Sequence, residues 1–251
     1  MSKNFELLQN LGKEQEMFAA PAAPAVAPVL QPVEVTPPQL AMYEGQRDEL
    51  GKLVLRLFLQ PETERPRCVM FAATEAENGC SWTCARAAEI LASQVAGTVC
   101  LVDANLHSPG LHEQFGVENY HGLVDSLLMP EPIRHFIHPL NRSNLWILSC
   151  GHEAGNGRLQ LSSDRAHARI SELRAQFDYV LIDAPPLSAG NETISVARAA
   201  DGIVLVLKAN STRRESTRKA VQELNNAKIK VLGAVLNQRT FPIPETIYHR
   251  L

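Results

Sequence analysis

An apolar stretch, a glycine-containing loop and an amphipathic segment follow one another between residues 68 and 92. The run Cys68–Ala73 has the length and composition of a buried strand, and the segment after Gly79 repeats small or apolar residues at helical spacing. Strand, loop and helix in this order can bind phosphate, because backbone N–H groups and the helix N-terminus then point at the anion. The stretch therefore predicts an α/β fold with a candidate anion site where the helix begins.

The reactive positions of this loop depart from the phosphate-loop pattern G-x-x-x-x-G-K-[ST]. In that pattern the lysine reaches the β- and γ-phosphates and the hydroxyl binds Mg²⁺. The last glycine and the hydroxyl are present as Gly79 and Ser81, but Cys80 replaces the lysine and Thr74 the first glycine. We therefore expect the scaffold of a phosphate loop without its main cation.

Strand and helix patterns alternate through the rest of the chain. The strands are near-continuous Val/Ile/Leu runs, which is typical of a parallel sheet with helices on both faces. The pattern predicts a doubly wound, mostly parallel α/β domain over residues 40–251. The expected strands are Cys68–Ala73, Thr98–Asp103, Leu145–Ser149, Tyr179–Asp183, Gly202–Leu207 and Lys230–Leu236, and the expected helices span about 80–95, 121–128, 160–176, 191–199 and 213–227.

The chain before residue 40 has a different character. Residues 1–18 contain a short amphipathic helix, which either docks on a partner protein or has no separate role. Residues 19–39 hold six Pro and six Ala, a composition that favours an extended, semi-rigid linker. A further helix over 40–59 carries an apolar stripe that suits packing on the domain, and Pro61 ends it.

Bulk composition narrows the class of protein. A net charge of −3 and a pI near 6.2 give no sign of nucleic-acid binding. We expect a cytoplasmic protein, because the sequence shows neither a signal peptide nor an apolar run of the roughly 18–20 residues that span a bilayer. The five scattered cysteines predict reduced thiols. Cys80 and Cys84, at i and i+4, could form a metal or redox pair, but no second Cys or His pair completes a site.

Two expected strands end in an aspartate, at Asp103 and Asp183. In parallel sheets ligands bind beyond the carboxyl ends of the strands, so both carboxylates should lie near the phosphate loop. Carboxylates in that position hold Mg²⁺ together with nucleotide phosphates. The alternative is that each aspartate caps the turn that follows its strand.

These motifs carry a resemblance to a known family. From about Arg47 to Leu251 the chain resembles the bacterial tyrosine kinases (BY-kinases) of capsule and exopolysaccharide export, which share a P-loop branch with the MinD/ParA ATPases. Its Ala76–Ser81, Val102–His112 and Leu181–Pro186 are similar to that family's Walker A, A′ and B motifs. The helix Glu49–Arg56 resembles the family helix that mediates ring assembly.

The resemblance implies a set of roles. It implies ATP or ADP with Mg²⁺ as ligands, a homo-oligomer formed through helix 41–59, and a membrane-anchored polysaccharide co-polymerase as partner at the inner membrane. Tyr248 is the implied phosphoacceptor. The implied catalytic residues are Asp103, Asn105 and Asp183; the implied cofactor contacts are Gly79, Cys80, Ser81, Trp82 and Asn237, the last of these to adenine; the implied metal ligands are Ser81, Asp103 and Asp183.

The departures from the family pattern fall on the chemistry. Besides Cys80, Glu77 replaces a glycine that lets the backbone approach phosphate, Asn105 replaces the acidic base of the A′ motif, and His107 replaces its arginine. The tail after residue 237 holds one tyrosine where the family has a cluster. Loss of a cation that stabilises the transferring phosphate costs orders of magnitude in rate. The sequence therefore favours a degenerate kinase that acts as a regulator or scaffold.

Two other functions stay open: an active tyrosine autokinase with a relocated cation, and a positioning ATPase of the MinD/ParA type. Against the latter function, this sequence has neither the signature lysine of such ATPases in its loop nor a basic C-terminal amphipathic helix. Trp82 either fills the phosphate pocket or packs on a neighbouring subunit. His107 and His112 either touch phosphate or face solvent, and the run Thr212–Lys219 is either a phosphate clamp or a solvated helix face.

Overall fold

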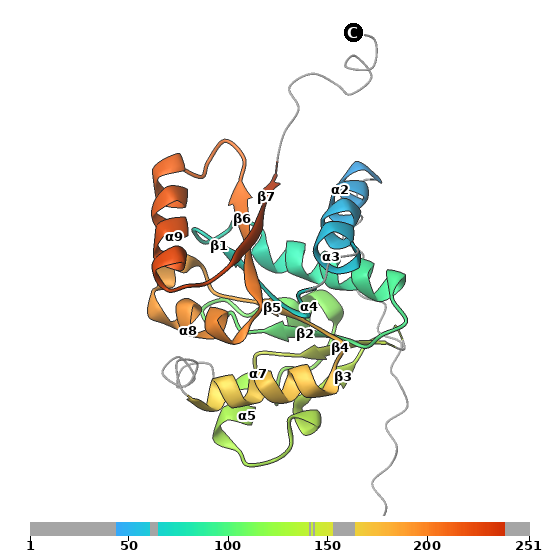
Figure 1. The fold of residues 1–251 in the computed structure, drawn as a ribbon. Helices are drawn as coiled ribbons and strands as arrows, with labels where there is room; N and C mark the ends of the chain where they lie inside the picture. The colour runs from blue at the N-terminus through green and yellow to red at the C-terminus, as the bar shows by residue number, and fades with distance from the viewer. Residues whose placement is uncertain (1–43, 61–64, 141, 143, 153–163, 239–251) are drawn as a thin grey trace, which may run out of the picture. The chain divides into compact units, whose positions relative to one another are not determined.

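A seven-stranded sheet forms the middle of the computed structural model (Figure 1). The structure describes residues 44–60, 65–140, 142, 144–152 and 164–238, so the expected helix at 1–18, the linker 19–39 and Tyr248 lie outside the described residues. The strand order is β3-β4-β2-β5-β1-β6-β7, and every neighbouring pair is parallel except β3 and β4. The strands are β1 Cys68–Ala73, β2 Val99–Asp103, β3 His138–Pro139, β4 Leu145–Leu148, β5 Tyr179–Asp183, β6 Gly202–Lys208 and β7 Val231–Asn237.

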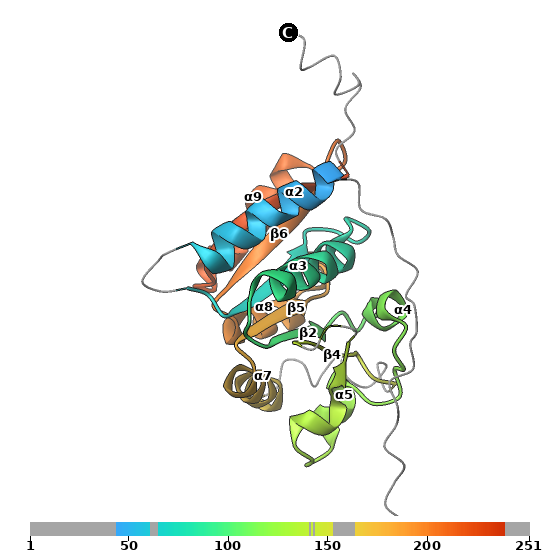
Figure 2. The same ribbon diagram turned by 90° about the vertical axis from the view of Figure 1, so that its right-hand side faces the viewer.

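Helices cover both faces of the sheet (Figures 1 and 2). Alternate residues of β1 point to opposite faces, so Met70 joins one buried apolar cluster and Phe71 the other. One face carries α2 Glu44–Val54, the π-helical turn η2 Leu55–Leu59, α3 Cys80–Gln94 and α4 Leu111–Phe115. The other carries α5 Leu123–Leu128, the 3-10 turns η3 Ile133–Phe136 and η4 Leu187–Ala189, α7 Asp164–Gln176, α8 Asn191–Ala199 and α9 Arg214–Asn226.

The doubly wound fold predicted from the sequence is confirmed. The bounds of β1, β5 and α8 agree with the predicted ranges. The predicted ranges of β2, β4 and β6 differ by one residue at one end, and that of β7 is shifted by one residue at both ends. Four elements were not predicted: the two-residue antiparallel strand β3 and the short segments α4, η3 and η4. The predicted helix over 40–59 consists, within its described part, of α2 followed by the wider turn η2.

The apolar stripe of α2 and η2 packs on the domain. Leu50, Val54 and Phe58 are buried, and the Phe58 ring meets the edge of Tyr179 with 5.8 Å between ring centroids. Figure 2 shows α2 lying along α3. The interpretation of this stripe as a packing surface is therefore confirmed.

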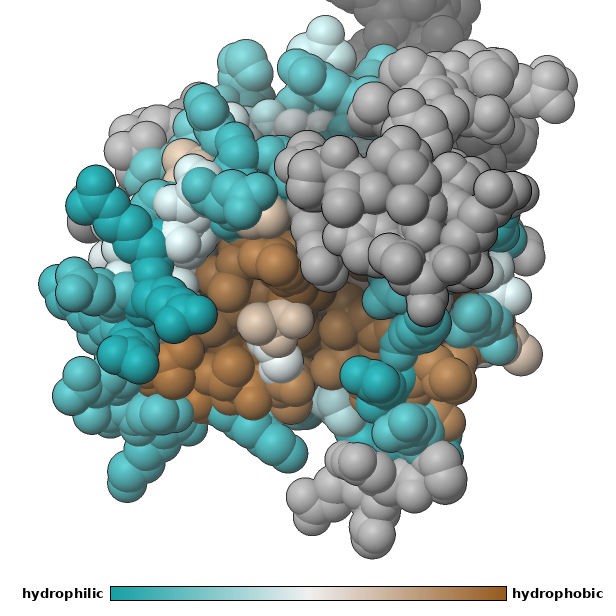
Figure 3. Space-filling view, turned by 90° about the horizontal axis from the view of Figure 1, so that it is seen from above, coloured by the Kyte–Doolittle hydropathy of each residue, from teal (hydrophilic) through white to brown (hydrophobic). Residues whose placement is uncertain are grey.

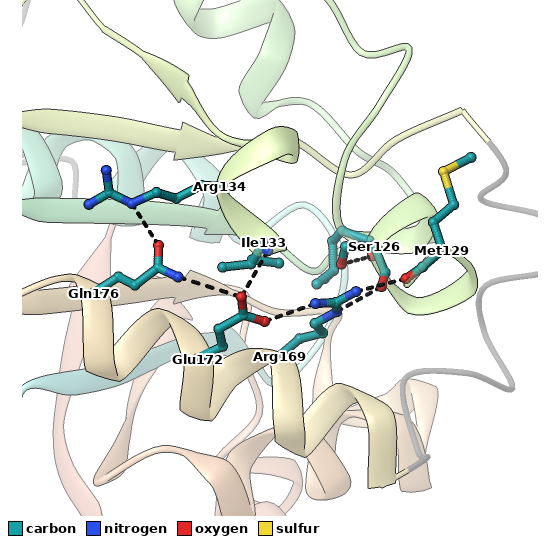
Figure 4. A network of polar contacts seen from close by, with 8 residues as sticks. Ser126, Met129, Ile133, Arg134, Arg169, Glu172 and Gln176 are labelled. Atoms are coloured by element: carbon teal, nitrogen blue, oxygen red, sulfur yellow. Dashed lines mark hydrogen bonds and ion pairs between the residues drawn. The ribbon is translucent and has the colours of Figure 1, made fainter. Parts of the chain in front are cut away.

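Two arginines of α7 hold the C-terminal end of α5. Arg169 donates to the carbonyl oxygens of Ser126 at 2.8 Å and Met129 at 2.7 Å, and Arg165 donates to that of Leu127 at 2.7 Å. Glu172 pairs with Arg169 and accepts from the backbone N–H of Ile133 (Figure 4). Because the last carbonyls of a helix have no partner within it, this network fixes a short helix that sequence propensity alone would not hold.

Candidate nucleotide site

The loop between β1 and α3 has the backbone shape of a phosphate loop. Gly79 caps α3 with φ of 77°, in the left-handed region, and its carbonyl accepts from both the backbone N–H and the hydroxyl of Thr83. Glu77 has φ of 61°, also left-handed, at the position where the kinase motif has a glycine. Such a conformation costs a non-glycine residue on the order of 1 kcal/mol or more. The loop therefore has the backbone conformation of a phosphate loop, but it carries Glu77 where glycine would adopt that conformation without strain.

Two asparagines tie this loop to the carboxyl ends of β6 and β7. Asn78 is 3% exposed, and its side-chain amide donates to the Val206 carbonyl at 3.4 Å. Asn237 donates from Nδ2 to the Asn78 carbonyl at 2.9 Å. A Cβ added to Gly79 would lie 2.3 Å from that Nδ2 atom. Asn237, which the resemblance assigns to adenine, thus lies directly on the phosphate loop, and only glycine fits beneath it.

The two strand-end aspartates are register partners with different surroundings. Asp103 and Asp183 are both 0% exposed, and they pair across β2 and β5. The Asp103 carboxylate accepts backbone N–H groups of Asn105 at 3.2 Å, Gly110 at 3.2 Å and Leu111 at 3.1 Å. Among the described residues, neither oxygen of Asp183 has a hydrogen-bond partner. Asp103 therefore caps the turn after its strand, whereas Asp183 does not.

Burial is the largest influence on the pKa values of Asp103 and Asp183. It raises the pKa of Asp103 above its ordinary value, against the three backbone N–H groups that lower it. Burial also raises the pKa of Asp183, the Asp103 charge raises it further, and the nearby Ser81 and Cys80 side chains lower it. With no cation from the described residues to neutralise them, the two carboxyl groups retain a proton more readily than exposed aspartates do.

The residues around Asp183 fit a magnesium ion held jointly with nucleotide phosphates. The unpartnered Asp183 oxygens and the Ser81 side chain lie together, and oxygen atoms are the ligands that Mg²⁺ prefers. When bound, such an ion would neutralise phosphate charge. The protein's own contribution is limited, because no group of three or more His, Cys, Asp and Glu side chains in the described part could hold a metal ion alone.

The cysteine at the lysine position is a neutral group. Cys80 is half-buried, and burial, followed by the charges of Asp183 and Cys84, raises the pKa of its thiol well above the ordinary value. Cys84 is buried, and its pKa is raised by the same burial and by both aspartates. All five cysteines are free thiols. At neutral pH Cys80 therefore supplies neither positive charge nor a thiolate.

Three further residues lie around this site in different ways. Trp82 is half-buried and packs against the apolar cluster shared by α2 and α3. Arg86 pairs with Glu89 at 2.6 Å and lies 5.8 Å from the Phe115 ring centroid, so its charge is already engaged. The Asn105 side-chain oxygen is buried and has no partner in the part of the chain described.

The loop histidines and the basic run are exposed to different degrees. His107 is exposed and His112 is half-buried. In the basic run, Arg213, Arg214, Arg218 and Lys219 are exposed, as expected of a solvated helix face. Thr212 is an exception, because its hydroxyl lies 3.5 Å from the Asn78 amide and accepts the Lys208 N–H at 2.8 Å. Sequence reasoning did not predict the contact between Asn78 and Thr212, because these residues are 134 positions apart.

Comparison with known proteins defines the class. The profile of the family described as "ParA: NUBPL iron-transfer P-loop NTPase" matches residues 76–249. The tyrosine-protein kinase YwqD of Bacillus subtilis (strain 168) is 33% identical over 171 residues, which cover 68% of this chain and 72% of YwqD. The fold and these matches show that the chain belongs to the ParA-like P-loop NTPases. Within them, it is a member of the bacterial tyrosine kinase (BY-kinase) family.

Further matches agree in fold and differ in length. The crystal structure of the chimerical protein CapA2B2 superimposes with a TM-score of 0.71 at 19% identity, covering 77% of this chain and 85% of that one. The tyrosine-protein kinase Etk of Escherichia coli (strain K12) is 25% identical over 180 residues, 72% of this chain but 24% of Etk. The chain thus spans most of YwqD and about a quarter of Etk. Within the described residues, none of the helices is both long and apolar enough to cross a membrane.

Proposed function

We propose that this chain is a catalytically degenerate tyrosine-kinase relative that acts as a regulator or scaffold in capsular or exopolysaccharide biosynthesis and export. The observation that carries the proposal is Cys80, a neutral thiol at the position of the phosphate-gripping lysine. Phosphoryl transfer depends almost entirely on positioning and on neutralising phosphate charge. A neutral thiol beside an aspartate does not neutralise that charge.

Three further features support a degenerate site with weak or lost nucleotide binding. Glu77 adds a negative, exposed side chain to the loop that would face phosphate. Asn105 cannot accept a proton as the acidic base of the family does. The Asp103 carboxylate is engaged by three backbone N–H groups. Any remaining nucleotide and Mg²⁺ would contact Gly79, Ser81, Asp183 and Asn237.

The proposed role rests on protein contacts. We assign homo-oligomer formation to the α2 and η2 segment, which keeps exposed charges at Arg47, Glu49 and Arg56 above its buried stripe. The partner would be a membrane-anchored polysaccharide co-polymerase, which would bring a cytoplasmic chain to the inner membrane. We propose no nucleic-acid partner, in line with the net charge of −3.

An active tyrosine autokinase is the second candidate, because relatives such as YwqD are named tyrosine-protein kinases. In that case Tyr248 or a partner protein would accept the phosphoryl group, and another cation would replace the missing lysine. A positioning ATPase is a third candidate, favoured only by the match to the ParA profile.

Mass spectrometry separates the first two candidates. The purified full-length chain is incubated with ATP and Mg²⁺, with and without the activator of an active homologue, and searched for phosphotyrosine. The proposal expects none. Phosphotyrosine on the wild type that disappears in an Asp183→Asn variant would establish an active kinase, and a Tyr248→Phe variant would locate the acceptor.

A further inference from the structure

The outermost strand of the sheet on the β6 side, β7, is long and apolar. β7 pairs only with β6, so its outer N–H and C=O groups have no strand partner among the described residues. Residues 231–236 read Val-Leu-Gly-Ala-Val-Leu, without a charge or a proline. Proteins normally protect edge strands with charges, prolines or coverage, because a bare edge pairs with other chains. β7 therefore has the properties of a binding edge.

Side chains along β7 add an exposed apolar surface to this edge. Leu236 is 56% exposed, Ala234 is exposed, and the other residues of the strand are half-buried. Leu55, on η2, is 49% exposed. Figure 3 shows an apolar area in the middle of one face of the molecule, with hydrophilic residues to its left and below it. Contiguous apolar surface bordered by polar residues marks interaction sites in soluble proteins.

Basic residues flank both ends of the strand. Lys228 and Lys230 are exposed just before β7 begins. At its other end, Asn237 pairs with Lys208, whose strand leads through a short turn into the exposed Arg213 and Arg214. α9 adds exposed Arg218 and Lys219 against two exposed glutamates, Glu215 and Glu223. Just before β7, on α9 and in the turn before α9 the exposed basic residues therefore outnumber the exposed acidic ones, while Glu75 and Glu77 are exposed on the loop that Asn237 contacts.

This charge pattern favours one kind of binding partner at the β7 edge over another. If the β7 strands of two copies paired antiparallel, Lys228 and Lys230 of one would lie near Arg213 and Arg214 of the other, and like charges would oppose the contact. An extended segment with acidic ends would meet opposite charges at both ends of the strand. Apolar side chains at alternate positions of that segment would cover Leu236 and its neighbours.

We propose that the β7 edge binds an extended segment of a partner protein, apolar at alternate positions and acidic at its ends, which joins the sheet as an additional strand. This extends the proposed scaffold role by giving the chemical character of the partner segment. The surface involves none of the nucleotide-loop residues except the neighbouring Asn237. The two proposals can therefore fail separately.

Fluorescence anisotropy of the full-length chain tests the proposal. The probe is a fluorescein-labelled nine-residue peptide of alternating valine and threonine with two glutamates at each end, and the matched probe has lysines in place of glutamates. The acidic peptide is expected to bind, and Leu236→Asp, or Arg214→Glu combined with Lys230→Glu, should weaken binding about tenfold or more. Leu128→Asp, at a leucine 43% exposed on α5, is the control and should leave binding unchanged.

Hydrogen exchange supplies the readout specific to strand addition. The peptide should slow exchange of the amides in residues 231–236, in the wild type and equally in a Cys80→Lys variant. Equal binding of the lysine peptide, no effect of Leu236→Asp, or protection confined to other elements would overturn the proposal. Light scattering that shows self-association of the wild type, abolished by Leu236→Asp without any peptide binding, would assign the edge to a second copy instead.

Discussion

Asp103 and Asp183 stand opposite each other at the ends of β2 and β5, and within the described residues backbone N–H groups donate to the Asp103 carboxylate but not to that of Asp183. Three backbone N–H groups from the turn after β2 converge on the Asp103 carboxylate, which links the strand to the start of α4. Asp183 is equally buried and has no such partner among the described residues. Asp103 thus stabilises the turn after β2, whereas the Asp183 carboxylate can bind a cation or retain a proton.

Asp183→Asn should stabilise the protein in metal-free solution at high pH. Burial and Asp103 raise the folded-state pKa of Asp183, so its contribution to stability is greatest below the unfolded value of about 4 and is lost as the pH rises through the raised value. Because asparagine does not ionise, the Asp183→Asn variant should not lose this stability as the pH rises. Thermal unfolding in EDTA should favour the variant by on the order of 1–3 kcal/mol at pH 9 and by less at pH 5. Parallel pH profiles for the two proteins would contradict this account.

Gly79→Ala should destabilise the phosphate loop through two causes. The added Cβ meets Nδ2 of Asn237 at 2.3 Å, and φ of 77° is unfavourable for alanine, so a loss on the order of 2 kcal/mol is expected in chemical denaturation. Combining it with Asn237→Ala should relieve the first cause, so the double variant loses less than the sum of the single ones. Gly110→Ala, whose Cβ would meet nothing within 4 Å, is the control. Strictly additive losses would show that the contact is absent.

Asp201→Asn should weaken the start of β6 in a pH-dependent way. Although burial opposes it, the backbone N–H groups of Cys68 and Arg67 and the Arg174 side chain hold the pKa of Asp201 below its ordinary value. Its contribution is present above the unfolded value of about 4 and is lost as the pH falls through the lowered one. After allowance for solvent screening, the variant should lose on the order of 1 kcal/mol at pH 7. Urea denaturation should show this difference disappearing toward pH 2, and a constant difference would exclude the ionic explanation.

Elements with strong local signals were predictable from the sequence. β1 and β5 are apolar runs of five or six residues with clear ends, and their predicted bounds hold. Both strand-end aspartates were placed correctly at one edge of the sheet, because parallel strands end on the same side. β3 could not be predicted, since two residues, His138 and Pro139, carry no period.

Contacts between residues that are far apart in the sequence could not be predicted from local sequence patterns. The run 231–236 reads like a buried central strand, yet the order of the strands places it at the edge and exposes Leu236. Asn237 and Asn78 are 159 positions apart, and only the meeting of β7 with the loop after β1 brings them together. The different roles of Asp103 and Asp183 likewise depend on where the turn at 104–110 folds back.

Isothermal titration of the full-length protein with ATP and Mg²⁺, beside a Cys80→Lys variant, tests the central claim most directly. We predict little or no heat of binding for the wild type and a clear gain for the variant, because the lysine restores the positive charge that the neutral thiol lacks. Micromolar binding by the wild type, unchanged in the variant, would contradict it. A cation elsewhere in the chain would then hold the phosphates, and the site would have to be regarded as functional.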